Sequence, residues 1–113
     1  MFSIYVVRVD LEEGQRADYQ MLHTHMEQVG FDREITNELG EKFRLPKGEY
    51  ATTAINKSLD EVRDLAMNAA DQTEKKYKVL AMQVVSFASA GMRKTVDFIP
   101  GLGPARRITE LGY

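Results

Sequence analysis

The sequence predicts an α+β fold in the order β-α-β-β-α-β, formed by residues 1–90 and followed by a C-terminal extension at 91–113. Two apolar runs rich in β-branched residues, SIYVVRVD near the N-terminus and YKVLAMQVVSFA after residue 76, are typical of strands. Two segments between them repeat apolar residues with a helical period. The chain between the two helical segments alternates apolar and polar residues and carries glycines where a turn is expected.

The first strand, SIYVVRVD, places successive side chains on opposite faces of a sheet. The face formed by Tyr5, Val7 and Val9 is wholly apolar and should pack beneath the helices. The opposite face begins apolar and ends in Arg8 and Asp10, so we expect only part of it to be covered.

The two helices are predicted from apolar stripes. The first stripe comprises Tyr19, Leu22, Met26 and Val29. Gly30 is expected to end this helix. The second helix is predicted to start at Ser58, because its hydroxyl and the Glu61 carboxylate fit a capping box. The second stripe comprises Val62, Leu65, Ala66 and Ala69.

Three further strands complete the prediction. The second is expected at 31–39, where the residues alternate and one face is acidic. A turn region at 40–48, with extra strand around Phe43, should lead to the third strand at 49–55. The apolar run at 77–88 is interpreted as the fourth strand, although periodicity alone does not distinguish so continuous an apolar run from a buried helix.

This order is that of the ferredoxin-like fold, an antiparallel four-stranded sheet with two helices on one face. The first and third strands would be central, and the fourth would be an apolar edge that invites pairing. A homodimer would cover both this edge and the open face of the sheet. The extension has the pattern of a short extra strand at 95–99, then a turn and a flexible tail.

Composition excludes several classes of function. With 113 residues and no cysteine, the chain has no disulfide framework, no thiolate zinc site and no thiol nucleophile. Residues 1–90 carry 11 Lys and Arg against 15 Asp and Glu, which argues against a protein that coats nucleic acid nonspecifically. Neither a signal peptide nor a membrane span is read from the sequence, so we expect a cytoplasmic protein with no membrane partner.

Asp10 and His23 are the candidate catalytic residues. Dimerisation across the face of Arg8 and Asp10 would bring two Asp10 carboxylates together, an arrangement that can hold a divalent cation or act on a phosphodiester. His23 can serve as an acid or base or contact RNA, and it lies about 200° around the helix from His25, so the two cannot share a metal ion. The plainer alternatives are a strand-end aspartate and two histidines that flank the apolar stripe.

A basic group in the expected turn region is the candidate RNA contact. Lys42, Arg44 and Lys47 surround Phe43, and such residues bind phosphates while an aromatic ring can stack on a base. The alternative is a solvated hairpin with no ligand.

Several segments resemble the GhoS family over residues 3–66. They are YVVRVD at 5–10, Gly30-Phe31, NELG at 37–40, Leu45, and YATT at 50–53 followed by the helix at 58–65. GhoS proteins are antitoxin endoribonucleases of type V toxin–antitoxin systems, and their fold is similar to that of the CRISPR-associated Cas2 nucleases. The resemblance implies an endoribonuclease that cleaves the messenger of a small membrane-active toxin.

The resemblance also implies roles for particular residues. Asp10 matches the strand-end aspartate of Cas2-like proteins, and Tyr50 matches an aromatic position of the family. His23 stands where the family is expected to have an arginine, so the chain departs from the pattern there. A final strand crosses to the other subunit in Cas2-like dimers, which the segment 95–99 could do here.

Two functions therefore compete. The first is a dimeric antitoxin endoribonuclease with RNA as its partner and no DNA partner. Its catalytic residues would be Asp10 and His23, its RNA-binding residues Arg8, Lys42, Arg44, Lys47 and Tyr50. No metal ligand is assigned, and the only cofactor considered is a divalent cation. The second is a non-catalytic, ferredoxin-like dimeric protein-interaction module, which the acidic body and the missing arginine favour.

Overall fold

The computed structural model describes residues 3–54, 56–99 and 103–107. Within these ranges the elements are β1 (Ser3–Leu11), α1 (Arg16–Gln28), β2 (Glu34–Thr36), β3 (Lys42–Arg44), β4 (Glu49–Ala54), α2 (Leu59–Asp71), β5 (Tyr77–Val84), β6 (Lys94–Ile99) and β7 (Gly103–Arg107). The predicted α+β class, with two helices and antiparallel pairing, is confirmed. No helix in the described part of the chain is both long and apolar enough to span a membrane.

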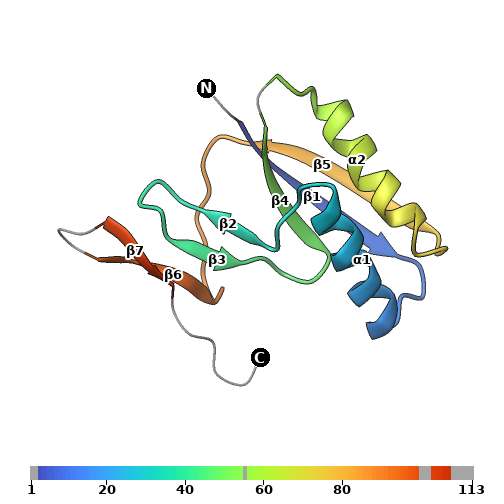
Figure 1. Cartoon of the computed structure of the whole chain (residues 1–113), viewed down its shortest axis with the longest axis horizontal. Coiled ribbons are helices and arrows are strands. Elements are labelled where there is room, and N and C mark those ends of the chain that lie inside the picture. The colour runs from blue at the N-terminus through green and yellow to red at the C-terminus, as the bar shows by residue number, and fades with distance from the viewer. Residues whose placement is uncertain (1–2, 55, 100–102, 108–113) are drawn as a thin grey trace.

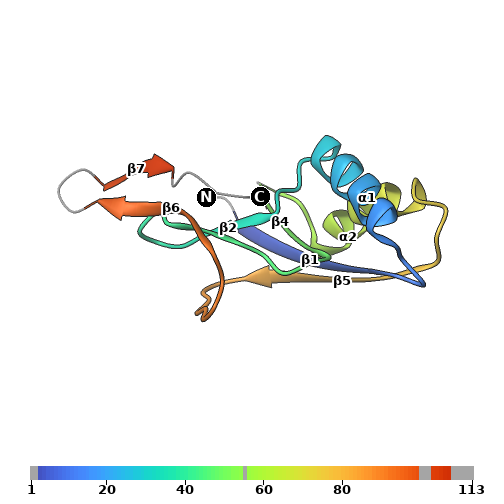
Figure 2. The same ribbon diagram turned by 90° about the horizontal axis from the view of Figure 1, so that it is seen from below.

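The strands form two antiparallel sheets. The first has the order β4-β1-β5, and the second has the order β2-β3-β6-β7. Both helices cover the same face of the first sheet (Figure 2). The second sheet extends away from the helices, with β6 and β7 at its far end (Figure 1).

The prediction of a single four-stranded sheet is wrong. The expected second strand at 31–39 is reduced to β2, which pairs with β3 in the second sheet. Among the described strands it does not pair with the first sheet; the backbone link lies just upstream, where Asp32 and Ala51 form an isolated bridge with two hydrogen bonds of 2.7 Å. The strand ends early because the Asn37 side-chain oxygen accepts hydrogen bonds from the N–H groups of Leu39 and Glu41, which forms a turn.

The core lies between the first sheet and the helices. Tyr5, Val7 and Val9 face the helices as predicted, and both valines are completely buried. They pack with residues of both helical stripes, Leu22, Met26, Val62, Ala66 and Ala69. Full burial of a valine contributes about 1.5–3 kcal/mol. The predicted cap of the second helix is also present, since the Ser58 hydroxyl accepts a hydrogen bond from the Glu61 N–H.

The opposite face of the first sheet is only partly covered, as the sequence predicts. A second apolar cluster, formed by Val6, Ile35, Leu45 and Ala51, covers the part of this face around Val6 and Ala51. The Phe43 ring packs against this cluster and meets the Phe87 ring edge-on at 6.4 Å. Phe43 is therefore engaged in packing between the two sheets.

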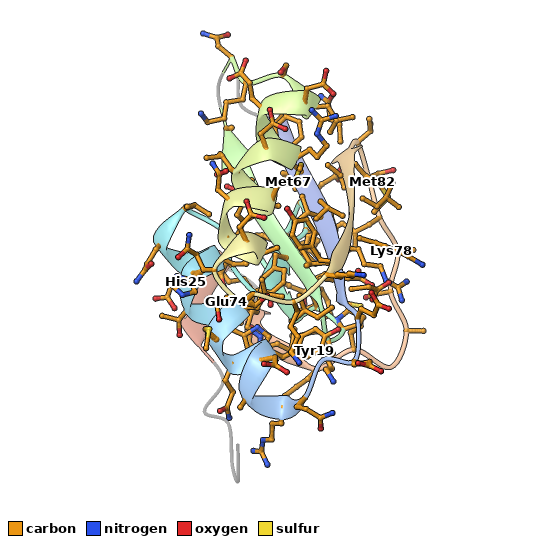
Figure 3. The ribbon with its side chains drawn as sticks, turned by 90° about the vertical axis from the view of Figure 1, so that its right-hand side faces the viewer. Tyr19, His25, Met67, Glu74, Lys78 and Met82 are labelled. Carbon is orange, nitrogen blue, oxygen red and sulfur yellow. The ribbon has the colours of Figure 1, made fainter. Side chains whose placement is uncertain are left out.

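The last predicted strand is present but shorter than expected, since β5 ends at Val84. It is an edge of the first sheet, because β1 is its only neighbour among the described strands. Leu80 and Met82 lie on the uncovered face and are 58% and 40% exposed. Lys78 and Met82 project on the side away from the helices (Figure 3).

The C-terminal extension contains the predicted extra strand. β6 pairs with β3 and with β7 of its own chain. Part of the segment that was expected to form a turn and a flexible tail is the strand β7. Residues 108–113 of that tail lie outside the described residues.

Gly48, at the entry to β4, has a backbone that a side chain would disturb. Its φ is +82°, and a Cβ added there would lie 2.7 Å from the Val9 carbonyl oxygen. We expect Gly48→Ala to lower the free energy of unfolding by about 2 kcal/mol or more in urea denaturation.

Gly30→Ala is the matched control. Gly30 also has a positive φ, of +94°, but no described atom lies within 4 Å of its added Cβ. It should cost only about 1 kcal/mol. Equal losses in the two variants would show that the contact with Val9 is unimportant.

Candidate active site

The candidate site is built on Tyr50, which is fixed by its position in β4. Tyr50 pairs with Val7, so its side chain lies on the helix-covered face of the first sheet. It is 1% exposed. A buried phenol hydroxyl needs a hydrogen-bond partner. That partner is the His23 ring, whose Nδ1 lies 2.5 Å from the Tyr50 hydroxyl oxygen.

His23 is held at this position by α1. Its neighbours on the helix, Leu22 and Met26, are completely buried and anchor the apolar stripe in the core. His23 lies beside this stripe and is partly exposed. The ring therefore has one edge against the buried Tyr50 and remains partly accessible to solvent.

The site is electropositive. The pKa of His23 is lowered from 6.5 to about 4, first by burial and then by the positive charges of Arg33, Arg44 and Lys47. The ring is therefore neutral near pH 7. Burial raises the pKa of Tyr50, so the phenol keeps its proton as well.

Three chain segments bring the cations to His23. Arg33 precedes β2 and Arg44 ends β3, and the Arg33 carbonyl accepts a hydrogen bond of 2.8 Å from the Leu45 N–H. Lys47 lies in the connection to β4, with its Nζ 4.2 Å from the centre of the Tyr19 ring. The segment before β2, the end of β3 and the connection to β4 thus bring positive charge towards α1.

The chemistry available follows from these protonation states. A neutral imidazole has one N–H and one lone pair, and Tyr50 engages Nδ1. Nε2 is therefore the nitrogen that remains for a ligand. A neutral ring beside three cations favours an anion, such as a phosphodiester, over a metal ion.

The model of the family described as endoribonuclease GhoS matches residues 2–89. The chain belongs to the GhoS endoribonuclease family. No curated protein matches the chain.

The GhoS match spans β1 to β5 and includes every residue of the site around His23. It ends before β6 and β7, so the C-terminal strands are an addition to the part of the chain that the family model describes.

The structure brings together only some of the predicted site residues. His23 and Tyr50 are hydrogen-bonded on the helix side of the first sheet, and Arg44 and Lys47 lie close enough for their charges to lower the pKa of His23. Lys42 lies on β3, two residues before Arg44, and its carbonyl accepts a hydrogen bond from the Thr95 hydroxyl. It is not among the charges that shift the pKa of His23.

Arg8 and Asp10 lie on the opposite face of the sheet from His23. Their side chains are both 56% exposed and form an ion pair of 3.7 Å. Asp10 pairs in register with Lys78, which Figure 3 shows on the side away from His25 and the helices. The structure thus separates the two predicted catalytic residues, Asp10 and His23. Among residues 3–54, 56–99 and 103–107, no three His, Asp or Glu side chains are grouped to hold a metal ion.

Arg33 is the site residue that sequence analysis missed. It is the second cause, after burial, of the lowered pKa of His23. In the sequence it appears only as one member of an alternating strand. One signal could have identified it. Arg33 follows the Gly30-Phe31 helix end by two residues, and a chain that turns at such a glycine stays close to the helix it has just left.

The lowered pKa of His23 makes stability depend on pH. Between pH 6.5 and about 4 the unfolded ring takes up a proton that the folded ring does not. The free energy of unfolding should therefore fall as pH falls through this range, by roughly 1–2 kcal/mol after allowance for the ring's partial exposure. Urea denaturation at a series of pH values measures this.

His23→Asn keeps a group that can bond to Tyr50 but does not titrate. Its free energy of unfolding should fall less steeply than that of the wild type over the same range. His25→Asn, on the same helix, is the control for a general effect of losing a histidine. Parallel curves for the wild type and His23→Asn would contradict the assigned pKa.

Proposed function

We propose that this chain is an endoribonuclease that binds and cleaves RNA at His23. The observation that carries the proposal is the hydrogen bond between His23 and the buried Tyr50, within reach of the charges of Arg33, Arg44 and Lys47. Membership of the GhoS endoribonuclease family supports RNA as the substrate.

The electrostatics favour a phosphodiester at this site. The cations that make protonation of His23 unfavourable make the approach of an anion favourable. A bound phosphate would offset their charge and allow the ring to take up a proton during the reaction. The remainder of the body is acidic, so RNA should bind at this local patch rather than along the whole protein.

The biological substrate we propose is the messenger of a small membrane-active toxin, which makes the protein a cytoplasmic antitoxin. This part of the proposal is supported by the resemblance to GhoS alone. Lys42 is another of the predicted RNA contacts. It lies on β3, the same strand as Arg44, and would bind RNA next to the site around His23.

Asp10 is the competing catalytic candidate. It is exposed, paired with Arg8 and lies across the sheet from His23. The geometry therefore favours His23 as the centre of catalysis and leaves Arg8 and Asp10 as surface residues of the open face.

We expect His23→Asn to lower the rate of RNA cleavage by about 100-fold or more, because loss of a general base typically costs that much. Tyr50→Phe should lower kcat with little change in KM, because Tyr50 orients the ring without touching RNA. Cleavage of a toxin-type messenger, followed by gel electrophoresis, measures both variants.

Asp10→Asn and His25→Asn are the controls, and both should cleave at the rate of the wild type. Cleavage that is lost in Asp10→Asn but kept in His23→Asn would place catalysis on the open face. A folded wild-type protein that binds a protein partner and cleaves no RNA would instead favour a non-catalytic interaction module.

We also propose that the chain forms a homodimer through β5 and the open face. The edge strand exposes Leu80 and Met82, and the charged residues around them are balanced, with Arg8 and Lys78 near Asp10 and Glu49. A second copy would meet apolar side chains and complementary charges, and its pairing would cover the free edge of β5.

Leu80→Lys tests the dimer in analytical ultracentrifugation. The wild type should sediment as a dimer and Leu80→Lys as a monomer, because a charge would then lie in the apolar contact. Leu59→Lys, at an exposed position of α2, should leave the dimer intact. A monomeric wild type would contradict the proposal.

A further inference from the structure

We infer that the chain cleaves RNA by transesterification, with the RNA's own 2′-hydroxyl as nucleophile, His23 as the base and arginine and lysine side chains neutralising the phosphate. The products would be a 2′,3′-cyclic phosphate and a 5′-hydroxyl, and no divalent cation would be needed. The inference rests on the proposed function and adds the reaction type and the product ends.

The geometry of the histidine suits the role of base. This role requires the tautomer in which Nδ1–H donates to the Tyr50 oxygen, because the lone pair is then on Nε2, the nitrogen that Tyr50 leaves for a ligand. After proton uptake at Nε2, the imidazolium still donates Nδ1–H to the same oxygen. The hydrogen bond therefore persists through the step and holds the ring in one orientation.

The surrounding charges suit the phosphate. The transition state of an attack on phosphorus carries more negative charge than the diester, and cations stabilise that increase. Arg33 approaches from the segment before β2, Arg44 from β3 and Lys47 from the loop, where the Tyr19 ring lies beneath its ammonium group. Guanidinium groups bind phosphate oxygens in pairs, which would fix the diester relative to Nε2.

The same charges argue against a metal ion beside His23. A divalent cation would be repelled by the three positive side chains whose fields already disfavour the imidazolium. The exposed carboxylate of Asp10 lies on the other face of the sheet. In the described ranges no three His, Asp or Glu residues are grouped so that they could hold a metal ion.

The step balances without a further reactant. His23 Nε2 takes the proton from the 2′-hydroxyl, the 2′-oxygen forms a bond to phosphorus, and the bond from phosphorus to the 5′-oxygen breaks. The departing 5′-oxygen takes a proton from water, and the imidazolium returns its proton to the solvent. The phosphate remains a diester with one negative charge.

The dependence on pH should reflect all the groups that face the ring. These are Tyr50 from β4, Arg33 from the segment before β2, Arg44 from β3 and Lys47 from the loop, with Tyr19 of α1 acting in turn on Tyr50. Because burial and then the cations keep the free ring neutral, kcat/KM should stay level as pH falls from 8 and drop only towards the His23 pKa of about 4.

Analysis of the product ends tests the inference. The full chain is incubated with a toxin-type messenger, and with a short RNA spanning the cleavage site, in EDTA and in Mg²⁺. We expect equal rates in both, 5′-hydroxyl ends that a kinase labels directly, and upstream fragments whose mass is that of a cyclic phosphate. A single 2′-O-methyl group at the cleaved nucleotide should abolish cleavage, and one placed two nucleotides away should not.

The outcomes separate the inference from the proposed function. RNA that is cut to 5′-phosphate ends, or only in Mg²⁺, or despite the 2′-O-methyl group, would overturn transesterification while the chain remained an endoribonuclease. Absence of cleavage by the folded wild type in both solutions would overturn the proposed function itself. Both the inference and the proposed function require that His23→Asn lose cleavage, and that His25→Asn keep it, in EDTA as well as in Mg²⁺.

Discussion

A phenol hydroxyl buried in a protein must be hydrogen-bonded, and Tyr50 meets this requirement at His23. An unsatisfied buried hydroxyl costs about 1–3 kcal/mol, so the bond constrains how α1 lies over β4. The same bond selects which ring nitrogen of His23 faces a ligand. Burial against Tyr50 and then the nearby cations lower the pKa of the ring and keep it neutral, and the cations also attract an anion. The position of the ring thus follows from one tertiary contact, and the charge around it is supplied by Arg33, Arg44 and Lys47.

The alternation of side chains along β1 divides the molecule into two chemical surfaces. Val7 and Val9 face the helices and form the floor of the core, and Tyr50 lies beside them because it pairs with Val7. Arg8 and Asp10 face the other way, next to the exposed residues of β5. A dimer formed on the open face would therefore leave the site around His23 accessible. The two proposals use different faces and can both hold for one molecule.

The sequence predicts those parts of the fold that depend on local period. The faces of β1, the stripes of both helices and the Ser58 cap are of this kind, and the structure confirms them. The second strand was predicted from alternation alone, and it is short because the Asn37 turn diverts the chain into another sheet. His23, Arg44 and Lys47 could be picked out by residue type. Their convergence with Arg33 could not, because it depends on how the second sheet returns towards α1, which no local pattern encodes. The same limit explains why Asp10 and His23 looked compatible in one site.

Binding at the site can be measured directly by NMR. A labelled sample titrated with a 2′-O-methyl RNA oligonucleotide, which cannot undergo transesterification, reports which side chains meet the phosphate backbone. If RNA binds at His23, the resonances of its ring nitrogens and of the Arg33 and Arg44 side chains should shift on binding. The pKa of His23 should also rise from about 4, because the bound phosphate offsets the cations. Shifts confined to Arg8, Asp10 and β5, with the His23 ring unchanged, would contradict binding at His23.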